Sequence, residues 1–238
     1  MGVLGFVPPQ MLGFVPVQWV RRQESRLSQI LGNSVRPDPR PIHDRIAERA
    51  AITAKVGEQP LWEGYGQGKA TRTPDQVKTR PEMGLVYSRL IEQIRPEVVV
   101  EFGTAFGMSG MYWLAGLELN GSGHLFTFDP NQVWADLARQ NLSAISERFT
   151  LTIGTFEDNV AILPGPIDFA FIDAIHTSEF VNPQFDIVAS RSHSQTVVVF
   201  DDINFSKDMR KCWDALAVDP RVRASAMLGR RVGIAELA

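Results

Sequence analysis

A short segment around residue 101 combines the residue types needed to hold a charged small molecule. An apolar run at residues 98–100 ends in Glu101, and Gly103 and Gly107 follow before a helical pattern begins. Glycines let backbone amides approach a ligand closely, and the start of a helix attracts an anion. Glu101 repels a pyrophosphate but suits a cation. The segment therefore predicts a site for a ligand that carries a carboxylate and an ammonium group, as an amino acid does.

Asp129 supplies a second acidic position, at the end of the next apolar run, residues 125–128. An acid at the end of a second strand accepts hydrogen bonds from both ribose hydroxyls of a nucleoside. Taken alone, Asp129 and Pro130 equally suit a turn that opens the next helix. Together with Glu101, however, Asp129 indicates one ligand with an amino-acid end and a nucleoside end. S-adenosylmethionine is such a molecule.

Three further acids are placed to meet at one edge of a sheet. Asp173 follows the apolar run at residues 167–172, and Asp201 and Asp202 follow the run at residues 196–200. Parallel strands joined by a helix bring their carboxyl ends to the same edge. Because like charges in a cleft repel, we expect a hard divalent cation with oxygen ligands, Mg²⁺ by default, between the three carboxylates.

These residues together resemble the class I S-adenosylmethionine-dependent methyltransferases, and more narrowly the catechol and caffeoyl-CoA O-methyltransferase type. The resemblance extends over residues 79–203. Carried over by position, it implies that the methyl donor contacts these residues: Thr79, Glu101, Gly103, Ser109, Asp129, Thr155, Phe156 and Asp173. It also implies that Mg²⁺, held by Asp173, Asp201 and Asp202, binds two vicinal oxygens of the acceptor and lowers the pKa of the hydroxyl to be methylated.

Two positions depart from the pattern of that family. The Asp-Asn pair that usually ends the fifth strand is Asp201-Asp202 here, which adds a negative charge. The lysine base of the family is replaced by His176, whose neutral imidazole can accept a phenol proton because its unperturbed pKa is ~6.5. His176 and Asp173 are therefore the predicted catalytic residues. Two alternatives remain: His176 caps the helix expected at residues 178–189, or it is the base of a methyltransferase that uses no metal.

Alternating strand and helix patterns surround these residues and indicate an α/β fold. We expect strands at residues 98–100, 125–128, 149–153, 167–172 and 196–200. We expect helices at residues 83–94, 108–119, 132–142, 158–163, 178–189 and 206–216. Such alternation predicts a Rossmann-like, doubly wound, mostly parallel sheet. Residues 222–228 and 231–237, separated by two residues, should add an antiparallel hairpin and complete seven strands.

The chain ahead of this alternation is expected to be accessory structure. Residues 17–55 show helical spacing, and residues 64–81 form a polar, glycine-dotted segment that is typical of a lid. We therefore assign residues 1–80 to an arm, accessory helices and a lid, and residues 81–238 to the donor-binding domain of one compact unit. Some side chains here could line an acceptor site, although core packing and a solvated loop are the simpler interpretations: Trp19, Trp62, Tyr65, Lys69, Arg72, Lys78 and Arg80.

The first 20 residues contain no charged side chain and are followed by Arg21 and Arg22. Three prolines and three glycines interrupt the run, no basic residue precedes it, and it lacks a small-residue cleavage site. The segment therefore fits neither a membrane span nor a signal peptide. We expect an apolar arm that packs on this subunit or joins a homodimer, with weak membrane contact as the alternative.

The composition excludes other classes of protein. Hydrophobic residues at 44% and charged residues at 21% are near globular averages, which excludes a disordered or coiled-coil chain. The net charge of −3 gives no general attraction to phosphate backbones, so we expect a small-molecule substrate and no nucleic acid. The single cysteine, Cys212, cannot form an intrachain disulfide, which indicates a reducing, cytoplasmic location.

Two other classes of function fit the same pattern less well. A nicotinamide-dependent oxidoreductase needs Gly-x-Gly-x2-Gly, whereas this chain has Gly103-x3-Gly107-x2-Gly110. A catalytically silent nucleoside-binding module would not need three aspartates and a histidine at the strand ends. With the resemblance, the sequence therefore predicts methyl transfer from S-adenosylmethionine to an oxygen of a small phenolic or vicinal-hydroxylated molecule, with Mg²⁺ as a second cofactor.

Overall fold

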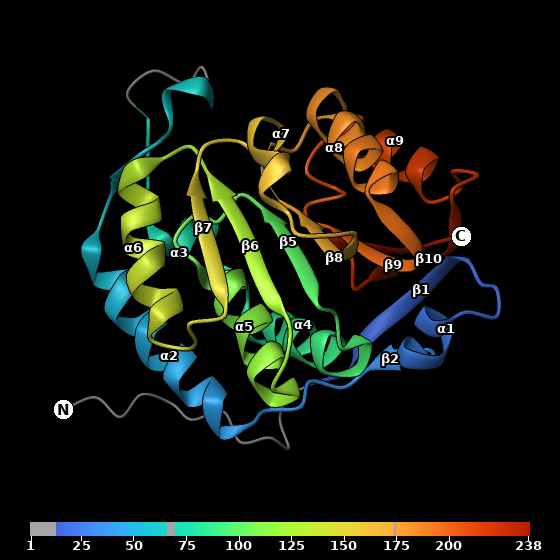
Figure 1. The fold of residues 1–238 in the computed structure, drawn as a ribbon, viewed down its shortest axis with the longest axis horizontal. Helices are drawn as coiled ribbons and strands as arrows, with labels where there is room; N and C mark the ends of the chain where they lie inside the picture. The colour runs from blue at the N-terminus through green and yellow to red at the C-terminus, as the bar shows by residue number, and fades with distance from the viewer. Residues whose placement is uncertain (1–12, 66–69, 174) are drawn as a thin grey trace.

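The computed structural model describes residues 13–65, 70–173 and 175–238. Within them, a nine-stranded sheet has the order β2-β1-β10-β11-β9-β8-β5-β6-β7, and helices cover both of its faces (Figure 1). The strands of this sheet are β1 Val15–Arg21, β2 Ser34–Val35, β5 Val98–Phe102, β6 His124–Asp129, β7 Phe149–Ile153, β8 Ile167–Ile172, β9 Ser192–Phe200, β10 Val222–Leu228 and β11 Val232–Leu237. The predicted doubly wound α/β fold is confirmed, with two strands more than the seven expected.

Five parallel strands, β9, β8, β5, β6 and β7, form the half of the sheet that carries the predicted site. The inner strands are runs of valine, isoleucine and phenylalanine, which suits strands covered on both faces. Backbone hydrogen bonds continue past the strand ends: the Asp173 amide donates to the Phe102 carbonyl, and the Asp201 amide donates to the Ile172 carbonyl, both at 3.1 Å. The acids that end these strands therefore lie along one edge of the sheet.

Two groups of helices cover the sheet. One face is covered by α1 Arg26–Leu31, α2 Pro41–Thr53, α4 Pro81–Ile94, α5 Met108–Asn120 and α6 Gln132–Ser143. The other face is covered by α7 Phe156–Asn159, α8 Ser178–Ser190 and α9 Lys207–Leu216. Glycines allow α4 and α5 to pack closely, since a Cβ at Gly84 would lie 2.2 Å from the ring of Tyr112. This packing holds α4 against α5 on this face of the sheet.

The start of the chain differs from the prediction. Residues 17–21 belong to strand β1 and not to a helix, and β1 pairs antiparallel with β10, so that the first strand lies beside the next-to-last strand (Figure 1). The physical reason is that burial alternates from residue to residue, as in a strand with one covered face: Val15, Val17 and Trp19 are partly buried, and the residues between them are exposed. Trp19 also donates its indole N–H to the Gly32 carbonyl at 2.7 Å. Further along, α1 and α2 confirm the expected accessory helices.

The predicted lid contains short regular elements. Strand β3 Gln59–Pro60 pairs with β4 Thr71–Arg72, and the single-turn helix α3 Pro74–Val77 follows. Lys69, the side chain of Tyr65 and residues 1–12 of the arm lie outside what the structure describes, so their predicted roles stay predictions. In the described part of the chain, none of the helices has both the length and the apolar character needed to cross a membrane.

Candidate active site

The loop after β5 is a tight turn that is fixed by its neighbours. Gly103 and Gly107 have φ angles of 86° and 79°, which favour glycine. The amides of Gly103 and Thr104 donate to the Phe128 carbonyl at 3.0 and 3.1 Å. A Cβ at Gly107 would lie 3.2 Å from the Cα of Ala138. The loop therefore takes its shape from β6 and α6, and it brings the N-terminus of α5 to the edge of the sheet.

Glu101 lies inside the protein, beneath this loop. Its side chain is 0% exposed and accepts hydrogen bonds from Ser109 Oγ at 2.6 Å, Trp113 Nε1 at 3.0 Å and Thr127 Oγ1 at 2.7 Å. Burial raises the pKa of Glu101 to about 7, although these three hydrogen bonds oppose the rise. The carboxyl group thus joins β5, β6 and α5. The contacts predicted between the donor and Glu101 or Ser109 stay predictions.

Asp129 ends β6 with its carboxylate held by the backbone. One oxygen accepts from the Ala105 amide at 2.7 Å, and the other accepts from the Asn131 amide at 2.8 Å. Burial raises the pKa of Asp129 to about 6, while the two amide hydrogen bonds lower it. Each carboxylate oxygen has further lone-pair capacity, so the group can still accept hydrogen bonds from a ligand.

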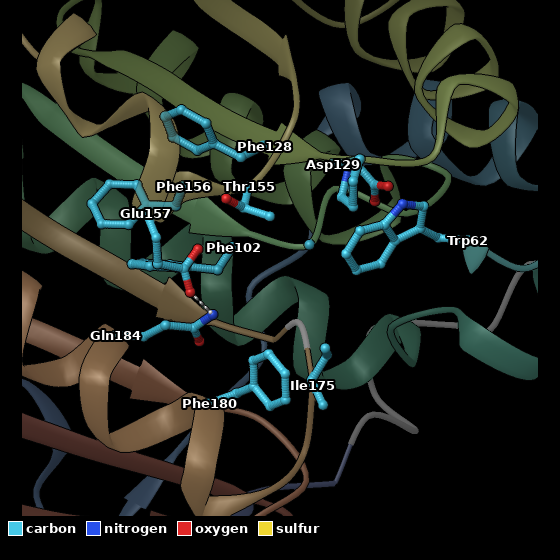
Figure 2. Close-up of a pocket in the computed structure, with 12 residues that line it drawn as sticks. Trp62, Phe102, Phe128, Asp129, Thr155, Phe156, Glu157, Ile175, Phe180 and Gln184 are labelled. Carbon is cyan, nitrogen blue, oxygen red and sulfur yellow. Dashed lines mark hydrogen bonds between the residues drawn. The ribbon is translucent and has the colours of Figure 1, made fainter. Parts of the chain in front are cut away.

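A cavity of about 280 Å³ opens beside Asp129 (Figure 2). Its lining is mainly apolar and includes Trp62, Phe102, Gly103, Phe128, Thr155, Phe156, Ile175 and Phe180. In the view of Figure 2, Trp62 lies at the end of the cavity near Asp129, and Gln184, which donates to Glu157 at 2.8 Å, lies at the other. The structure thus brings together four of the predicted donor contacts, Gly103, Asp129, Thr155 and Phe156. We call this space the first cavity.

Phe156 and Thr155 have structural roles as well as a place in this lining. Phe156 is 2% exposed, and its ring centroid lies 4.2 Å from that of Phe102 and 5.2 Å from that of Phe128. The Thr155 hydroxyl accepts from the Asp158 amide at 3.3 Å and so caps α7. These contacts fix the wall of the first cavity before any ligand binds.

The carboxylates at the ends of β8 and β9 have an arginine partner. Arg231 Nη2 lies 2.7 Å from Asp201 Oδ2, and Arg231 Nε lies 3.0 Å from Asp201 Oδ1 and 2.8 Å from Asp202 Oδ1. The Ile203 amide donates to the Arg231 carbonyl at 3.0 Å, so backbone and side chain are both held. Burial and the charge of Asp201 raise the pKa of Asp173 and of Asp202. Arg231 therefore balances charge that the sequence assigned to a metal.

His176 lies beside the same carboxylates. Its Nε2 atom is 3.7 Å from Asp173 Oδ1 and 3.6 Å from Asp202 Oδ2, and its ring packs 5.4 Å from the ring of Phe205. Burial lowers the pKa of His176, although Asp202 opposes the change. The structure thus brings His176, Asp173, Asp201 and Asp202 together, as predicted, and keeps the imidazole neutral near neutral pH.

The cluster does not fit the predicted Mg²⁺ site. Over residues 13–65, 70–173 and 175–238, no group of three or more His, Cys, Asp or Glu side chains is arranged to hold a metal ion. Both carboxylate oxygens of Asp201 already accept from Arg231, and one oxygen of Asp202 forms an ion pair with it. A divalent cation in contact with these oxygens would have to displace the guanidinium or lie against its positive charge. We therefore derive no catalytic step through a metal.

A second cavity, of about 430 Å³, lies on the β9 side of the acid cluster. It is lined by residues from segments 13–16, 79–83 and 228–232, together with Tyr87 and Asp201. Thr79 therefore lines the second cavity and not the first, and its predicted contact with the donor stays a prediction. Of the basic lid residues, Arg80 lines this cavity, whereas Lys78 forms an exposed ion pair with Asp75 at 2.7 Å.

The sequence interpretation missed Arg231 and Tyr87. The hairpin was expected to have a two-residue turn with Arg231 already in its second strand. Instead Leu228 pairs with Val232, so a three-residue turn places Arg231 beside the end of β9. The sequence did contain a signal for Arg231. Because the hairpin was predicted to close the sheet, an arginine in its turn should lie near the end of the strand beside it, which is β9.

The comparisons with known proteins support the class predicted from the sequence. Residues 100–203 match the family described as Methyltransferase domain. The match, which covers less than half of the chain, agrees with the Rossmann-like fold and with the predicted resemblance to the class I, S-adenosylmethionine-dependent methyltransferases. No curated protein matches the chain.

Several solved structures are similar. An O-methyltransferase from Bacillus cereus in complex with SAH has a TM-score of 0.65 and 20% identity, covering 89% of this chain and 95% of that one. The O-methyltransferase TomG from Streptomyces achromogenes, involved in tomaymycin synthesis and in complex with SAM, has a TM-score of 0.61 and 18% identity, covering 80% and 90%. An SAH-bound methyltransferase from Podospora anserina has a TM-score of 0.59 and 15% identity, covering 84% and 99%. At these identities the likeness concerns the fold.

Proposed function

We propose that this protein transfers the methyl group of S-adenosylmethionine to an oxygen atom of a small molecule. One observation carries the proposal: a largely apolar cavity with Asp129 at one end lies next to the strand end that carries Asp173 and His176. The similar structures from Bacillus cereus and Streptomyces achromogenes, described as O-methyltransferases bound to SAH and SAM, support this choice of donor and acceptor atom.

The donor would lie in the first cavity with its ribose against Asp129. The carboxylate accepts from ribose hydroxyls, while Phe156 and the other apolar side chains contact the adenine ring. The Gly103 loop and the N-terminus of α5 are close to where the amino-acid end would extend. Glu101, whose oxygens hold Ser109, Trp113 and Thr127, would keep this loop in shape.

His176 would act as the base. Its neutral Nε2 takes the proton from the acceptor hydroxyl, the oxygen attacks the methyl carbon in line with the sulfonium, and the carbon–sulfur bond breaks to release S-adenosylhomocysteine. Asp202, whose Oδ2 lies 3.6 Å from Nε2, and the neighbouring Asp201 favour the imidazolium that forms. The proton then leaves to solvent, since the imidazole side chain is 21% exposed.

We further propose that this step needs no metal, in contrast to the Mg²⁺ dependence expected from the sequence. The support is the guanidinium of Arg231, which pairs with Asp201 and Asp202. A phenol with a single hydroxyl would then be as good an acceptor as one with two vicinal hydroxyls, because no ion has to hold both oxygens. Turnover in excess EDTA tests this point, and loss of turnover that Mg²⁺ restores would refute it.

The proposal is tested most directly by calorimetry with S-adenosylhomocysteine, followed by a crystal structure of the complex. We expect binding in the first cavity and loss of binding in Asp129→Ala. Because the variant leaves the Ala105 and Asn131 amides without their acceptor, thermal unfolding is measured in parallel to show that it is folded at the temperature of the titration. A bound nucleoside elsewhere, or no heat for the wild-type protein, would refute the placement of the donor. Binding without methyl transfer to any phenol would instead favour the silent nucleoside-binding module.

A further inference from the structure

The second cavity is adjacent to the catalytic edge, and the donor does not account for it. Asp201, a member of the acid cluster, lies in its wall, and the turn that carries Arg231 forms one side. Along the sheet, the first cavity lies over the ends of β5 and β6, the acid cluster over the ends of β8 and β9, and the second cavity beyond β9. The acid cluster thus lies between two spaces, one for each substrate of a transferase.

Tyr87 gives the second cavity an unsatisfied polar group. Its side chain comes from α4 and is 1% exposed, and its ring is stacked on Trp113 at a centroid distance of 4.3 Å and tilted against Phe171 at 5.4 Å. Among the described residues its hydroxyl has no hydrogen-bond partner. The oxygen is not fully enclosed by protein, so the hydroxyl is accessible from the cavity. Because Tyr87 lines the cavity, a bound molecule is the natural partner for this hydroxyl.

The charged residues of the second cavity are mostly basic. Arg231 is matched by Asp201, and Glu82 is a second acid. Arg80 and Arg230 also line the cavity, and within the described chain neither of their guanidinium groups forms an ion pair. Guanidinium groups match the planar, two-oxygen geometry of a carboxylate. The cavity therefore favours an anionic ligand.

The remaining walls are apolar. Val15, Met83, Leu228 and Val232 contribute side chains, and the volume of about 430 Å³ is in the range of sites for drug-sized ligands. The cavity is apolar, with the Tyr87 hydroxyl on the side of the acid cluster and Arg80 and Arg230 available for an anion. Such a space suits a flat molecule whose two ends differ in chemistry. One end would carry the reacting oxygen and the other the negative charge.

We propose that the second cavity binds the methyl acceptor, and that this acceptor is a small aromatic carboxylic acid whose polar end bonds to Tyr87 and whose carboxylate pairs with Arg80 and Arg230. The inference rests on the proposed function, which supplies the donor in the first cavity. Tyr87 acts as a binding residue, and the two arginines determine specificity.

The test is binding, measured by calorimetry on protein saturated with S-adenosylhomocysteine. Three phenols with one ring and different charge serve as probes: para-hydroxybenzoate, the isosteric neutral para-hydroxybenzamide, and the cation tyramine. We expect para-hydroxybenzoate to bind about tenfold more tightly than the amide, and tyramine to bind most weakly. Equal affinities for the three probes would overturn the assignment of an acid.

Variants then assign the residues. Tyr87→Phe should weaken both para-hydroxybenzoate and the amide roughly fivefold, because both lose the same hydrogen bond. The double variant Arg80→Gln/Arg230→Gln should remove only the advantage of the acid over the amide. Arg139→Gln, an exposed arginine on α6 that does not line the cavity, is the matched control and should change neither.

The outcomes separate this inference from the proposed function. If S-adenosylhomocysteine binds but no phenol does, or if Tyr87→Phe keeps its melting temperature and binds all probes unchanged, the second cavity is not the acceptor site. If S-adenosylhomocysteine does not bind, the proposed function fails first. If Tyr87→Phe unfolds, the arginine double variant still decides whether the cavity selects for charge.

Discussion

The two cavities at the carboxyl edge of the sheet balance negative charge in different ways. At the first cavity, Asp129 accepts from the amides of Ala105 and Asn131, which carry no net charge. At the second, Asp201 and Asp202 are balanced by the guanidinium of Arg231. Neutral donors leave the charge of Asp129 available to ribose hydroxyls, whereas an arginine cancels charge and fills the space beside the carboxylates.

The two regions would therefore have different tasks: the first cavity binds the donor, and the acid cluster sets the charge around the proposed base. The first cavity keeps one acid ready for a nucleoside, and burial holds its pKa close to 6. The acid cluster keeps a fixed positive charge, Arg231, next to the proposed base, His176, and this charge is the support for the proposed step without a metal.

The largest effect should follow from removing His176 at the acid cluster. His176→Ala should lower kcat by about 100- to 10,000-fold, because the acceptor hydroxyl loses its base. Binding of S-adenosylhomocysteine should stay within about twofold, since the first cavity is intact. In the wild-type protein the rate should fall as pH drops, with a midpoint below 6.5, because burial lowers the pKa of His176 and only the neutral ring accepts a proton. Rate against pH measures both effects.

A second histidine gives the control for this experiment. His193 is exposed and lies 2.7 Å from Asp168, away from the cluster. His193→Gln should keep the rate and the acid limb of the wild-type profile. An acid limb that persists in His176→Gln, with a rate near that of the wild type, would make His176 a structural residue.

Beneath the loop after β5, Glu101 should make stability depend on pH. Its pKa rises from 4.5 to about 7 on folding, so between these values the unfolded chain is ionised while the native carboxyl holds its proton. The free energy of unfolding should therefore fall by roughly 3 kcal/mol as pH rises through this window, and then level off. Glu101→Gln cannot titrate and should lack this part of the fall.

The measurement is urea unfolding of wild type and Glu101→Gln between pH 4.5 and 7.5. The difference between the two curves isolates the residue from other titrating acids. Exposed Glu24 provides the control, and Glu24→Gln should follow the wild-type curve. Parallel curves for wild type and Glu101→Gln would show that Glu101 is ionised inside the protein.

At the first cavity itself, Asp129→Asn should weaken S-adenosylhomocysteine by about 10- to 100-fold, because the ribose hydroxyls lose a charged acceptor. Wild-type affinity should also decline below pH 6, where the carboxyl group takes up a proton, and the variant should be insensitive over the same range. Calorimetry at several pH values measures both. Asp136→Asn, at an exposed acid that accepts from Gln132, is the control, and an equal loss there would refute a specific role for Asp129.

Most of the parallel sheet could be predicted, because each apolar run reports burial directly. The strands at 149–153 and 167–172 agree with β7 and β8 to the residue. Strand β1 was missed since its partner, β10, is about 200 residues away in the chain, and a single alternating run at the start of a sequence is ambiguous. A local pattern of apolar residues gives no information on which distant strand a segment pairs with.

Part of the candidate site could also be predicted, because several of its residues have positions that follow directly from the predicted strands. Strand parity explains Glu101: it shares a face with Val99, toward α5, whereas Phe102 faces the other side, where the first cavity lies. Asp173 and Asp201 follow from the strand ends alone. Arg231 does not, because its position depends on β11 pairing with β9 and on a turn of three residues.

Removing the guanidinium of Arg231 should have only a small effect on stability, but it tests directly how the charge of the acid cluster is balanced. Arg231→Ala should lower the melting temperature by a few degrees, since a guanidinium that is half exposed contributes about 1 kcal/mol or less. It also leaves Asp173, Asp201 and Asp202 without their fixed cation. Millimolar Mg²⁺ should therefore raise the melting temperature of the variant, because an ion that binds only the native state stabilises it.

The wild-type protein gives the decisive contrast in this thermal measurement. Its melting temperature should not change with Mg²⁺ or with EDTA, because the guanidinium already occupies the place beside the carboxylates. Arg231→Lys keeps a charge without the two-pronged geometry and should show an intermediate response. If Mg²⁺ stabilises the wild type as much as Arg231→Ala, the cluster accepts a metal beside Arg231. The two cavities would then not differ in the way their charge is balanced.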